Sequence, residues 1–187
     1  DPETIEDISK VGYGGVLCIE TGGPTPGLGC AGRGIIATFS LLEDLELFEI
    51  HQPDVVLYDV LGDVVCGGFS MPMRRGYADK VFVITSGENM AIHAAANIAM
   101  AVENFKDRGY AQLGGLILNR RNVKNEDAKV EELAEDIHSK VIGTLSRSAL
   151  VTDAEEQKKT VIEAYPDSEM AEEYRILAGE ICTLCEI

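Results

Sequence analysis

Short, continuously apolar runs alternate along the chain with longer amphipathic stretches, and this alternation limits the choice of fold. The runs have strand length and lack an apolar–polar alternation, which is typical of strands buried on both faces. We expect such strands at residues 16–20, 54–60, 80–86, 113–119 and 140–145. We expect helices at residues 35–49, 89–106, 124–139 and 167–181. This order of elements predicts an α/β fold, a parallel sheet with helices on both faces.

Two of the predicted loops combine glycine with cysteine. GGPTPGLGCAGRG, residues 22–34, follows the expected strand at 16–20, and LGDVVCGG, residues 61–68, follows the expected strand at 54–60. In open α/β sheets the ligand-binding residues lie in loops at the carboxyl ends of the strands. Both loops are therefore candidates for a functional site.

The second loop begins with a carboxylate and a glycine. Asp59 ends the expected strand, and Gly62 follows three residues later. A strand that ends in Asp-x-x-Gly can present a carboxylate to a magnesium-bound water and a glycine amide to a terminal phosphate. Asp and Gly are also common in ordinary turns, so the motif alone leaves both interpretations open.

Cys30 and Cys66 are each flanked by glycine, unlike a cysteine that only fills a core. Glycine lets the backbone approach closely, and its amide can point at a sulfur or an inorganic sulfide. Cys18 stands inside an apolar run, where we expect a buried structural cysteine. Two thiolates are too few for a closed tetrahedral metal site or a four-cysteine cluster, but a twofold dimer would supply four.

Composition narrows the class of protein. A chain of 187 residues with 45% hydrophobic content and no linker is long enough for one globular domain, so we expect a single domain over residues 1–187. Its 32 acidic and 16 basic residues give a net charge of -16, and the basic residues are not clustered. This charge disfavours binding to nucleic acid.

Cysteine usage and hydropathy indicate a compartment. No apolar run approaches the roughly 18 residues that a membrane helix requires, so we expect no membrane partner. Five cysteines are an odd number, and they do not form the pattern of a secreted disulfide framework. A reducing compartment fits better, and we expect a cytoplasmic location.

Four stretches of the chain resemble the iron protein of nitrogenase and its nitrogenase-like relatives. They are YGGVLCIETGGPTPGLGCAGRGI, YDVLGDVVCGGFSMP, LGGLILNRRN and TVIEAYPDSEMAEEYR, in the same order and at nearly the same spacing as in that family. The resemblance covers essentially the whole chain. It implies a P-loop NTPase fold and a homodimeric ATPase, the ATP-hydrolysing component of a nitrogenase-type reductase.

The resemblance also implies the cofactors and their ligands. One 4Fe-4S cluster per dimer would be held by Cys30 and Cys66 of each subunit. MgATP would be hydrolysed to MgADP as single electrons pass to a nitrogenase or nitrogenase-like catalytic component. Asp59 resembles the switch carboxylate near magnesium, Gly62 the glycine that senses the terminal phosphate, and Asp63 the carboxylate that polarises the attacking water.

Four further residues resemble binding residues of the family. Arg33 resembles the arginine that docks the partner protein and that some members modify to switch activity off. Asn119 resembles a residue in contact with the adenine, and Glu155 and Tyr174 resemble neighbours of the ribose and the adenine. Apart from the resemblance, the last three are ordinary residue types at strand ends and on helix surfaces.

The sequence departs from the family pattern in two places. Ser146, Arg147 and Ser148 stand where nitrogenase iron proteins usually carry Pro-Arg-Asp near the adenine. The sequence contains no G-x-x-x-x-G-K-[ST] segment, the loop that cradles phosphates. Because the family carries that loop upstream of the position where this sequence begins, we expect the fold here without its first strand and P-loop.

An iron-sulfur cluster carrier or scaffold ATPase of the related P-loop class is the alternative function. Such carriers generally use a closely spaced C-x-x-C at the dimer interface. The C-x-x-C of this chain, Cys182 to Cys185, falls on the expected terminal helix instead, which favours the electron donor. The final substrate, whether dinitrogen, a tetrapyrrole or another compound, stays open.

Overall fold

The structure is a computed structural model, which describes residues 4–20, 31–62, 70–74 and 76–187, with the backbone alone for 31–33. The chain divides into two compact units, Asp1–Pro72 and Met73–Ile187. The expected single domain over the whole chain stays a prediction.

The first unit begins with a short antiparallel hairpin that differs from the expected fold. α1 (Ile5–Ile8) leads into β1 (Ser9–Val11), which pairs with β2 (Leu17–Ile19) across the turn η1 (Tyr13–Gly15). Gly14 in this turn has φ 68°, a conformation that glycine adopts without strain. The prediction missed β1, and it was wrong to place residues 16–20 in a parallel sheet.

A single helix was expected at residues 35–49, but the structure has two. α2 (Ala31–Asp44) ends before Glu46, whose left-handed backbone (φ 52°) interrupts the helix, and α3 (Leu47–His51) follows. Leu42 and Leu47 pack with Ile5 in a small core between these helices and the hairpin. Among the described residues, this unit therefore has only a small buried core.

The expected strand at residues 54–60 is absent, and this prediction was wrong. The segment is irregular, and no described segment forms a ladder with it. A strand exists only when a neighbour satisfies its backbone groups, and an apolar run does not supply that neighbour. The apolar side chains here are accordingly exposed, Leu57 most of all at 82%.

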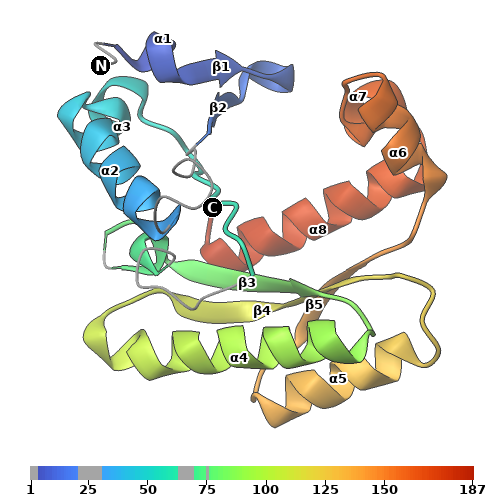
Figure 1. Cartoon of the computed structure of the whole chain (residues 1–187). Helices are drawn as coiled ribbons and strands as arrows, with labels where there is room; N and C mark the ends of the chain where they lie inside the picture. The colour runs from blue at the N-terminus through green and yellow to red at the C-terminus, as the bar shows by residue number, and fades with distance from the viewer. Residues whose placement is uncertain (1–3, 21–30, 63–69, 75) are drawn as a thin grey trace. The chain divides into compact units, whose positions relative to one another are not determined.

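The second unit is built on a parallel sheet, as expected. β3 (Lys80–Thr85), β4 (Gln112–Asn119) and β5 (Val141–Leu145) lie side by side in the order β3-β4-β5 (Figure 1). The intervening and following helices are α4 (Asn89–Phe105), α5 (Glu126–Asp136), α6 (Ala149–Glu156), α7 (Val161–Ala164) and α8 (Glu169–Cys185). Short 3-10 turns occur at η2 (Met71–Met73) and η3 (Lys106–Arg108). The strand and helix boundaries agree with the sequence pattern to within a few residues, but α6 and α7 were not predicted.

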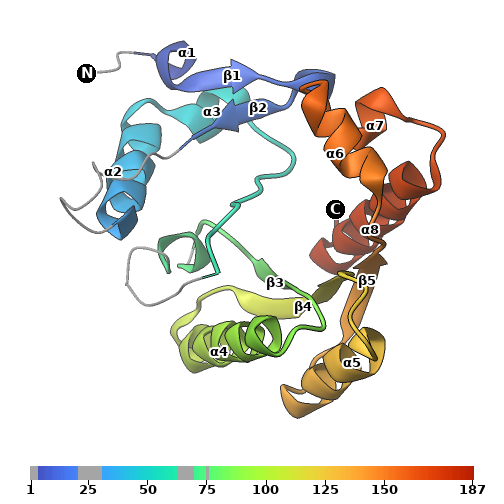
Figure 2. The same ribbon diagram turned by 45° about the vertical axis from the view of Figure 1, so that its right-hand side comes forward.

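Helices cover both faces of this sheet. α4 and α5 pack on one face, where Val83, Leu116, Leu118 and Val130 form a core with almost no exposed surface. α8 lies on the opposite face against β5 (Figures 1 and 2). Gly143 leaves room for Leu177 there, because a Cβ at that position would lie 2.6 Å from Leu177 Cδ1. The expected α/β architecture is thus confirmed for this unit.

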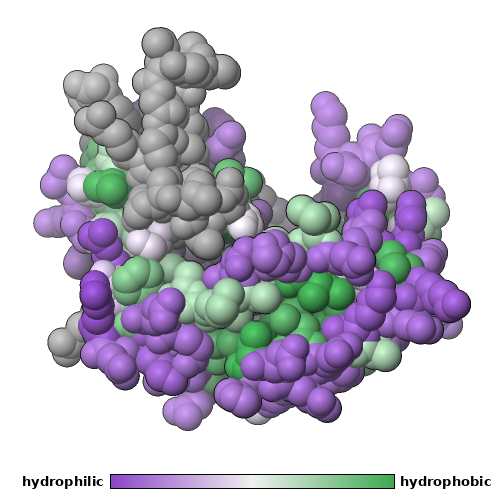
Figure 3. Space-filling view, turned by 60° about the horizontal axis from the view of Figure 1, so that its bottom comes forward, coloured by the Kyte–Doolittle hydropathy of each residue, from purple (hydrophilic) through white to green (hydrophobic). Residues whose placement is uncertain are grey.

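The surface on the side of α4 and α5 is mainly polar. Figure 3 shows hydrophilic side chains over most of this side, with a band of apolar side chains between them. Within the ranges that the structure describes, no helix has the length and apolar character needed to cross a membrane.

Candidate functional site

The first cysteine loop leads directly into a helix. Cys30, Cys66 and Asp63 lie outside the described residues, but α2 begins at Ala31, the residue after Cys30. The first turn of this 14-residue helix contains Arg33 and no acidic residue. Free backbone N–H groups and the helix dipole favour a thiolate at such a position.

The segment that carries Asp59 and Gly62 is attached to the same helix by an aromatic pair. Tyr58 stacks on Phe39 of α2, with ring centroids 5.4 Å apart and an interplanar angle of 28°. Burial raises the pKa of the Tyr58 hydroxyl, while Asp59 and Gly62 themselves are exposed. The aromatic pair therefore joins the Asp-x-x-Gly segment to the helix that follows Cys30.

The three residues that resemble nucleotide-base neighbours belong to the second unit, and two of them lie at the end of β5. Asn119, the last residue of β4, pairs with Leu145 in the parallel ladder. Tyr174 of α8 packs on the cluster that contains Leu145 and Ala154. Glu155 is exposed on α6, next to buried Ala154. The structure thus brings Asn119 and Tyr174 to the end of one strand, although the sequence separates them widely.

The turn where the sequence departs from the family is tightly bonded. The Ser146 backbone N–H and hydroxyl donate to the two carboxylate oxygens of Glu173, at 2.6 and 2.7 Å. Ser148 Oγ accepts from the Leu150 N–H and so caps α6. Glu173 was not among the predicted site residues, and residue spacing could not have identified it, because the pairing joins α8 to the β5–α6 turn.

The connection from β4 to α5 is also fixed by polar contacts. Arg120 forms a hydrogen-bonded ion pair with Asp127, and this hydrogen bond raises the pKa of Arg120 above its ordinary value. The Arg121 N–H donates to Glu126 Oε2 at 2.9 Å, and Glu126 is buried. The backbone just after Asn119 is therefore held in one arrangement.

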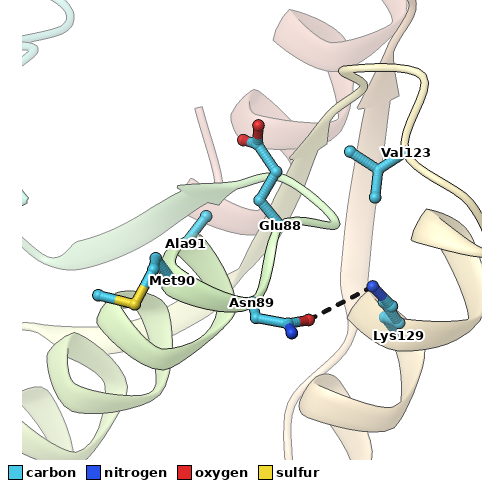
Figure 4. A pocket seen from close by; sticks show the side chains of 6 residues that line it. All are labelled: Glu88, Asn89, Met90, Ala91, Val123 and Lys129. Atoms are coloured by element: carbon cyan, nitrogen blue, oxygen red, sulfur yellow. Dashed lines mark hydrogen bonds between the residues drawn. The ribbon is translucent and has the colours of Figure 1, made fainter.

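A pocket of about 590 Å³ opens at the carboxyl ends of β3 and β4 (Figure 4). Its lining comes from the start of α4, the β4–α5 connection and α5: Glu88, Asn89, Met90, Ala91, Val123 and Lys129. Lys129 Nζ donates to Gly87 O at 3.1 Å and to Asn89 Oδ1 at 3.4 Å. The Ser86 hydroxyl donates to Glu88 Oε2 at 2.9 Å. These hydrogen bonds join polar groups within the protein and stiffen the turn between β3 and α4.

None of the residues that line this pocket was among the predicted site residues. The signal was present in the sequence, because Ser-Gly-Glu-Asn directly follows the expected strand at 80–86. Polar residues and glycine after a parallel strand mark the edge where ligands bind.

Gly87 in this turn is tightly packed, and we expect Gly87→Ala to lower the free energy of unfolding by about 3 kcal/mol. A Cβ there would lie 2.2 Å from Glu126 Cβ and 2.6 Å from Glu126 Cα, so backbone would have to move. Urea denaturation followed by circular dichroism measures the change. Gly179→Ala is the matched control, since no atom lies within 4 Å of its added methyl, and it should be neutral or slightly stabilising. Equal stability of the two variants would contradict the packing argument.

The remaining cysteines do not form a metal site in the part of the chain that the structure describes. Cys18 is exposed on β2, so the expected buried structural cysteine was wrong: a two-stranded hairpin leaves one of its faces open. Cys182 and Cys185 lie on α8 and are half-buried, as expected. No three His, Cys, Asp or Glu residues among those described are grouped for a metal ion.

Comparison with known proteins gives matches along nearly the whole chain. Residues 2–186 match the family described as 4Fe-4S iron sulfur cluster binding proteins, NifH/frxC family. The chain is 50% identical over 182 residues to a nitrogenase iron protein of Methanospirillum hungatei, a match that covers 96% of this chain and 64% of the relative. It is 49% identical over 177 residues to nitrogenase iron protein 2 of Methanothermobacter thermautotrophicus, covering 95% of this chain and 65% of the relative. The chain thus spans less than two thirds of these curated relatives.

Solved structures of low sequence identity share the fold. The MinD cell division protein of Aquifex aeolicus matches with a TM-score of 0.58 and 16% identity, covering 81% of this chain and 61% of that one. The cell division ATPase MinD of Pyrococcus furiosus matches with a TM-score of 0.57 and 16% identity, covering 82% and 59%. These similarities support the α/β architecture and carry no functional argument by themselves.

Proposed function

Because the chain belongs to the NifH/frxC family of 4Fe-4S iron-sulfur cluster binding proteins, we propose that it is part of an ATP-dependent electron donor. The family match, which runs across both compact units, is the observation that carries this proposal. It also supports treating the two units as parts of one nucleotide-binding domain. The full-length protein would be a homodimer that couples MgATP hydrolysis to single-electron transfer.

Cys30 and Cys66 are the proposed cluster ligands of each subunit. The donor set suits the group, since four thiolates hold a 4Fe-4S cluster and a twofold dimer provides two pairs. The start of α2 at Ala31 supports Cys30 in this role, because the helix N-terminus stabilises the negative charge of a thiolate and its sulfide neighbours. When bound, the cluster supplies a one-electron redox centre.

Asp59, Gly62 and Asp63 are the proposed residues for nucleotide hydrolysis. Asp59 would hold the magnesium water shell, the Gly62 N–H would bond to the terminal phosphate, and Asp63 would orient the attacking water. Asn119, Glu155 and Tyr174 would flank the base and the ribose. The positions of Asn119 and Tyr174 at the end of β5 support this assignment for the base.

A physical link between hydrolysis and redox chemistry follows from the first unit. Movement of the backbone at Asp59 must be accommodated at Tyr58, which is stacked on Phe39 of α2. Since α2 begins beside Cys30, a shift of this helix changes the surroundings of one proposed ligand. A second route runs along the chain from Gly62 to Cys66, a few residues away. Phosphate-dependent rearrangements of this kind are a common form of switching.

The proposed partner is a nitrogenase or nitrogenase-like catalytic component, with Arg33 in the first turn of α2 as part of the docking surface. Relatives named nitrogenase iron protein support this choice. A helix N-terminus that carries an arginine beside the redox centre would suit an acidic partner surface. A cytoplasmic location, which the sequence predicts, would suit an exchange of this kind.

The test of the proposed function is a chelation experiment on the reduced full-length dimer under anaerobic conditions. About four irons per dimer should be present, and MgATP should make them more accessible to an iron chelator than MgADP does. A ligand shifts an equilibrium only by its differential affinity, so the two nucleotides must differ. Gly62→Ala, which crowds the amide at the terminal phosphate, should remove the difference and keep the cluster. Equal chelation rates with the two nucleotides in the wild type would contradict the coupling, and a labile cluster that moves to an apo-ferredoxin would favour a carrier.

A further inference from the structure

One carboxylate fixes the turn after β5. Glu173 of α8 accepts two hydrogen bonds from a single residue, from the Ser146 N–H at 2.6 Å and from the Ser146 hydroxyl at 2.7 Å. Both groups are half-buried. Short bonds to an ionised acceptor are roughly twice as strong as bonds between neutral groups. This contact therefore ties α8 firmly to the turn at residues 146–148.

The rest of the turn is held from other elements. Ser148 caps α6. Arg147 Nη1 lies 3.4 Å from Arg121 O in the β4–α5 connection. The Arg120 N–H donates to Leu145 O at 2.9 Å, just before the turn. Within the described chain, Glu173 is thus the residue of α8 that hydrogen-bonds to this turn. Its replacement would remove the contact between the turn and α8 and keep the contacts with the other elements.

The turn lies among the residues that resemble base neighbours. Tyr174 directly follows Glu173 on α8 and packs on the Leu145 cluster. Asn119 pairs with Leu145, the residue before Ser146. A ligand that contacts both Asn119 and Tyr174 would therefore lie next to the turn at residues 146–148, whose position Glu173 fixes.

We propose that Glu173 is a positioning residue for the base of an adenine nucleotide. It acts through Ser146, since each of its two carboxylate oxygens accepts a hydrogen bond from that residue. Proline, the residue that the resemblance implies at position 146, lacks both the N–H and the hydroxyl, so it could form neither of the two hydrogen bonds that Ser146 donates to Glu173. The inference rests on the proposed function, since it assumes that the full-length protein binds MgATP.

Base binding and phosphate binding can be separated by experiment. The residues proposed for the phosphates, Asp59, Gly62 and Asp63, belong to the Asp-x-x-Gly loop, far along the sequence from the turn at residues 146–148. Magnesium tripolyphosphate carries the phosphates of ATP without the base. A substitution that disturbs only the contacts to the base should weaken the binding of MgATP and leave the binding of magnesium tripolyphosphate unchanged.

The experiment compares the two ligands by calorimetry on the full-length dimer. Glu173→Ala should weaken MgATP binding about tenfold, which corresponds to about 1.4 kcal/mol, and leave the affinity for magnesium tripolyphosphate unchanged. Ser146→Ala keeps the backbone N–H bond and should weaken MgATP binding about threefold, as expected when one of two hydrogen bonds is lost. The iron content should stay at the wild-type value in both variants.

Glu172→Ala is the matched control. Glu172 precedes Glu173 on the same helix, is exposed, and pairs only loosely with Arg175 at 3.4 Å. Its replacement should change neither affinity. The positioning role would be overturned if Glu173→Ala lowered the affinities for MgATP and tripolyphosphate equally, or lowered neither. It would also be overturned if Glu172→Ala had the same effect as Glu173→Ala. A wild-type protein that bound tripolyphosphate and MgATP equally well would overturn it too, whereas one that bound neither would overturn the proposed function itself.

Discussion

We expect Cys66→Ser to remove the iron from the full-length dimer and to leave a folded protein. Each subunit is proposed to provide two of four thiolates, so the substitution leaves the cluster with two. A serine hydroxyl stays protonated near neutral pH and is a harder ligand than the thiolate that iron-sulfur clusters require. We expect the iron content to fall from about four per dimer to nearly zero, and Cys30→Ser to give the same result. Iron analysis and the visible absorption of the anaerobically purified protein measure the loss.

Two other cysteines serve as controls for this result. Cys18 is exposed on the hairpin, so Cys18→Ala removes no core packing and should keep the full iron content. Cys182→Ala changes a half-buried thiol on α8 and should also keep it. Circular dichroism should show the same helix content in every variant. A Cys66→Ser protein with a full complement of iron would rule out the shared-ligand arrangement.

The parallel sheet could be predicted because its strands carry their own burial signal. Leu116 and Leu118 point to one face of β4 and Ile117 to the other, and all three are at most 3% exposed. A run that is apolar on both faces has no stable alternative but the middle of a layered fold. The order of strands and helices then gave the parallel topology.

The same pattern failed at residues 54–60 and at Cys18 for one physical reason. An apolar run indicates that a segment tends to be buried. Strand formation also requires a neighbouring segment that hydrogen-bonds to the backbone N–H and C=O groups of the strand. Residues 54–60 find none among the described segments, and Leu57 is 82% exposed. Cys18 has a partner strand but only one, so its side chain stays open to solvent.

The sequence contains start signals for three helices of the second unit, two of which were not predicted. Ser148, Thr160 and Ser168 each accept a backbone hydrogen bond at the start of α6, α7 and α8. Serine and threonine at such positions are the usual start signals of a helix. The break between α2 and α3 had no comparable signal, because Glu46 adopts a left-handed conformation that glutamate seldom takes.

The candidate site could be predicted only as far as local motifs reach. Gly62 and Asp59 share one short loop, and Asn119 ends a strand, so each is visible from the sequence. The bond from Glu173 to Ser146 spans 27 residues and depends on how α8 lies across β5. Contacts of this kind follow from packing, which residue spacing does not encode.

Asp63→Asn should slow ATP hydrolysis by the full-length protein at least about a hundredfold, with nucleotide binding retained. An amide of the same size can still accept a hydrogen bond from water, so we expect nucleotide binding to survive. It cannot accept the proton that the attacking water loses, and a positioned base of this kind typically contributes a factor of about 10² to 10⁴ to the rate. Phosphate release at saturating MgATP measures the rate, and calorimetry with MgADP measures the binding.

The control for Asp63→Asn is the same substitution at a carboxylate outside the proposed site. Asp54 lies at the start of the same apolar segment and is exposed, so Asp54→Asn should leave hydrolysis within about twofold of the wild type, as is usual for surface substitutions. If Asp63→Asn hydrolysed MgATP at the wild-type rate, Asp63 would not be the base. The carboxylate of Asp59, the other acidic residue proposed for this loop, would then be the group to test.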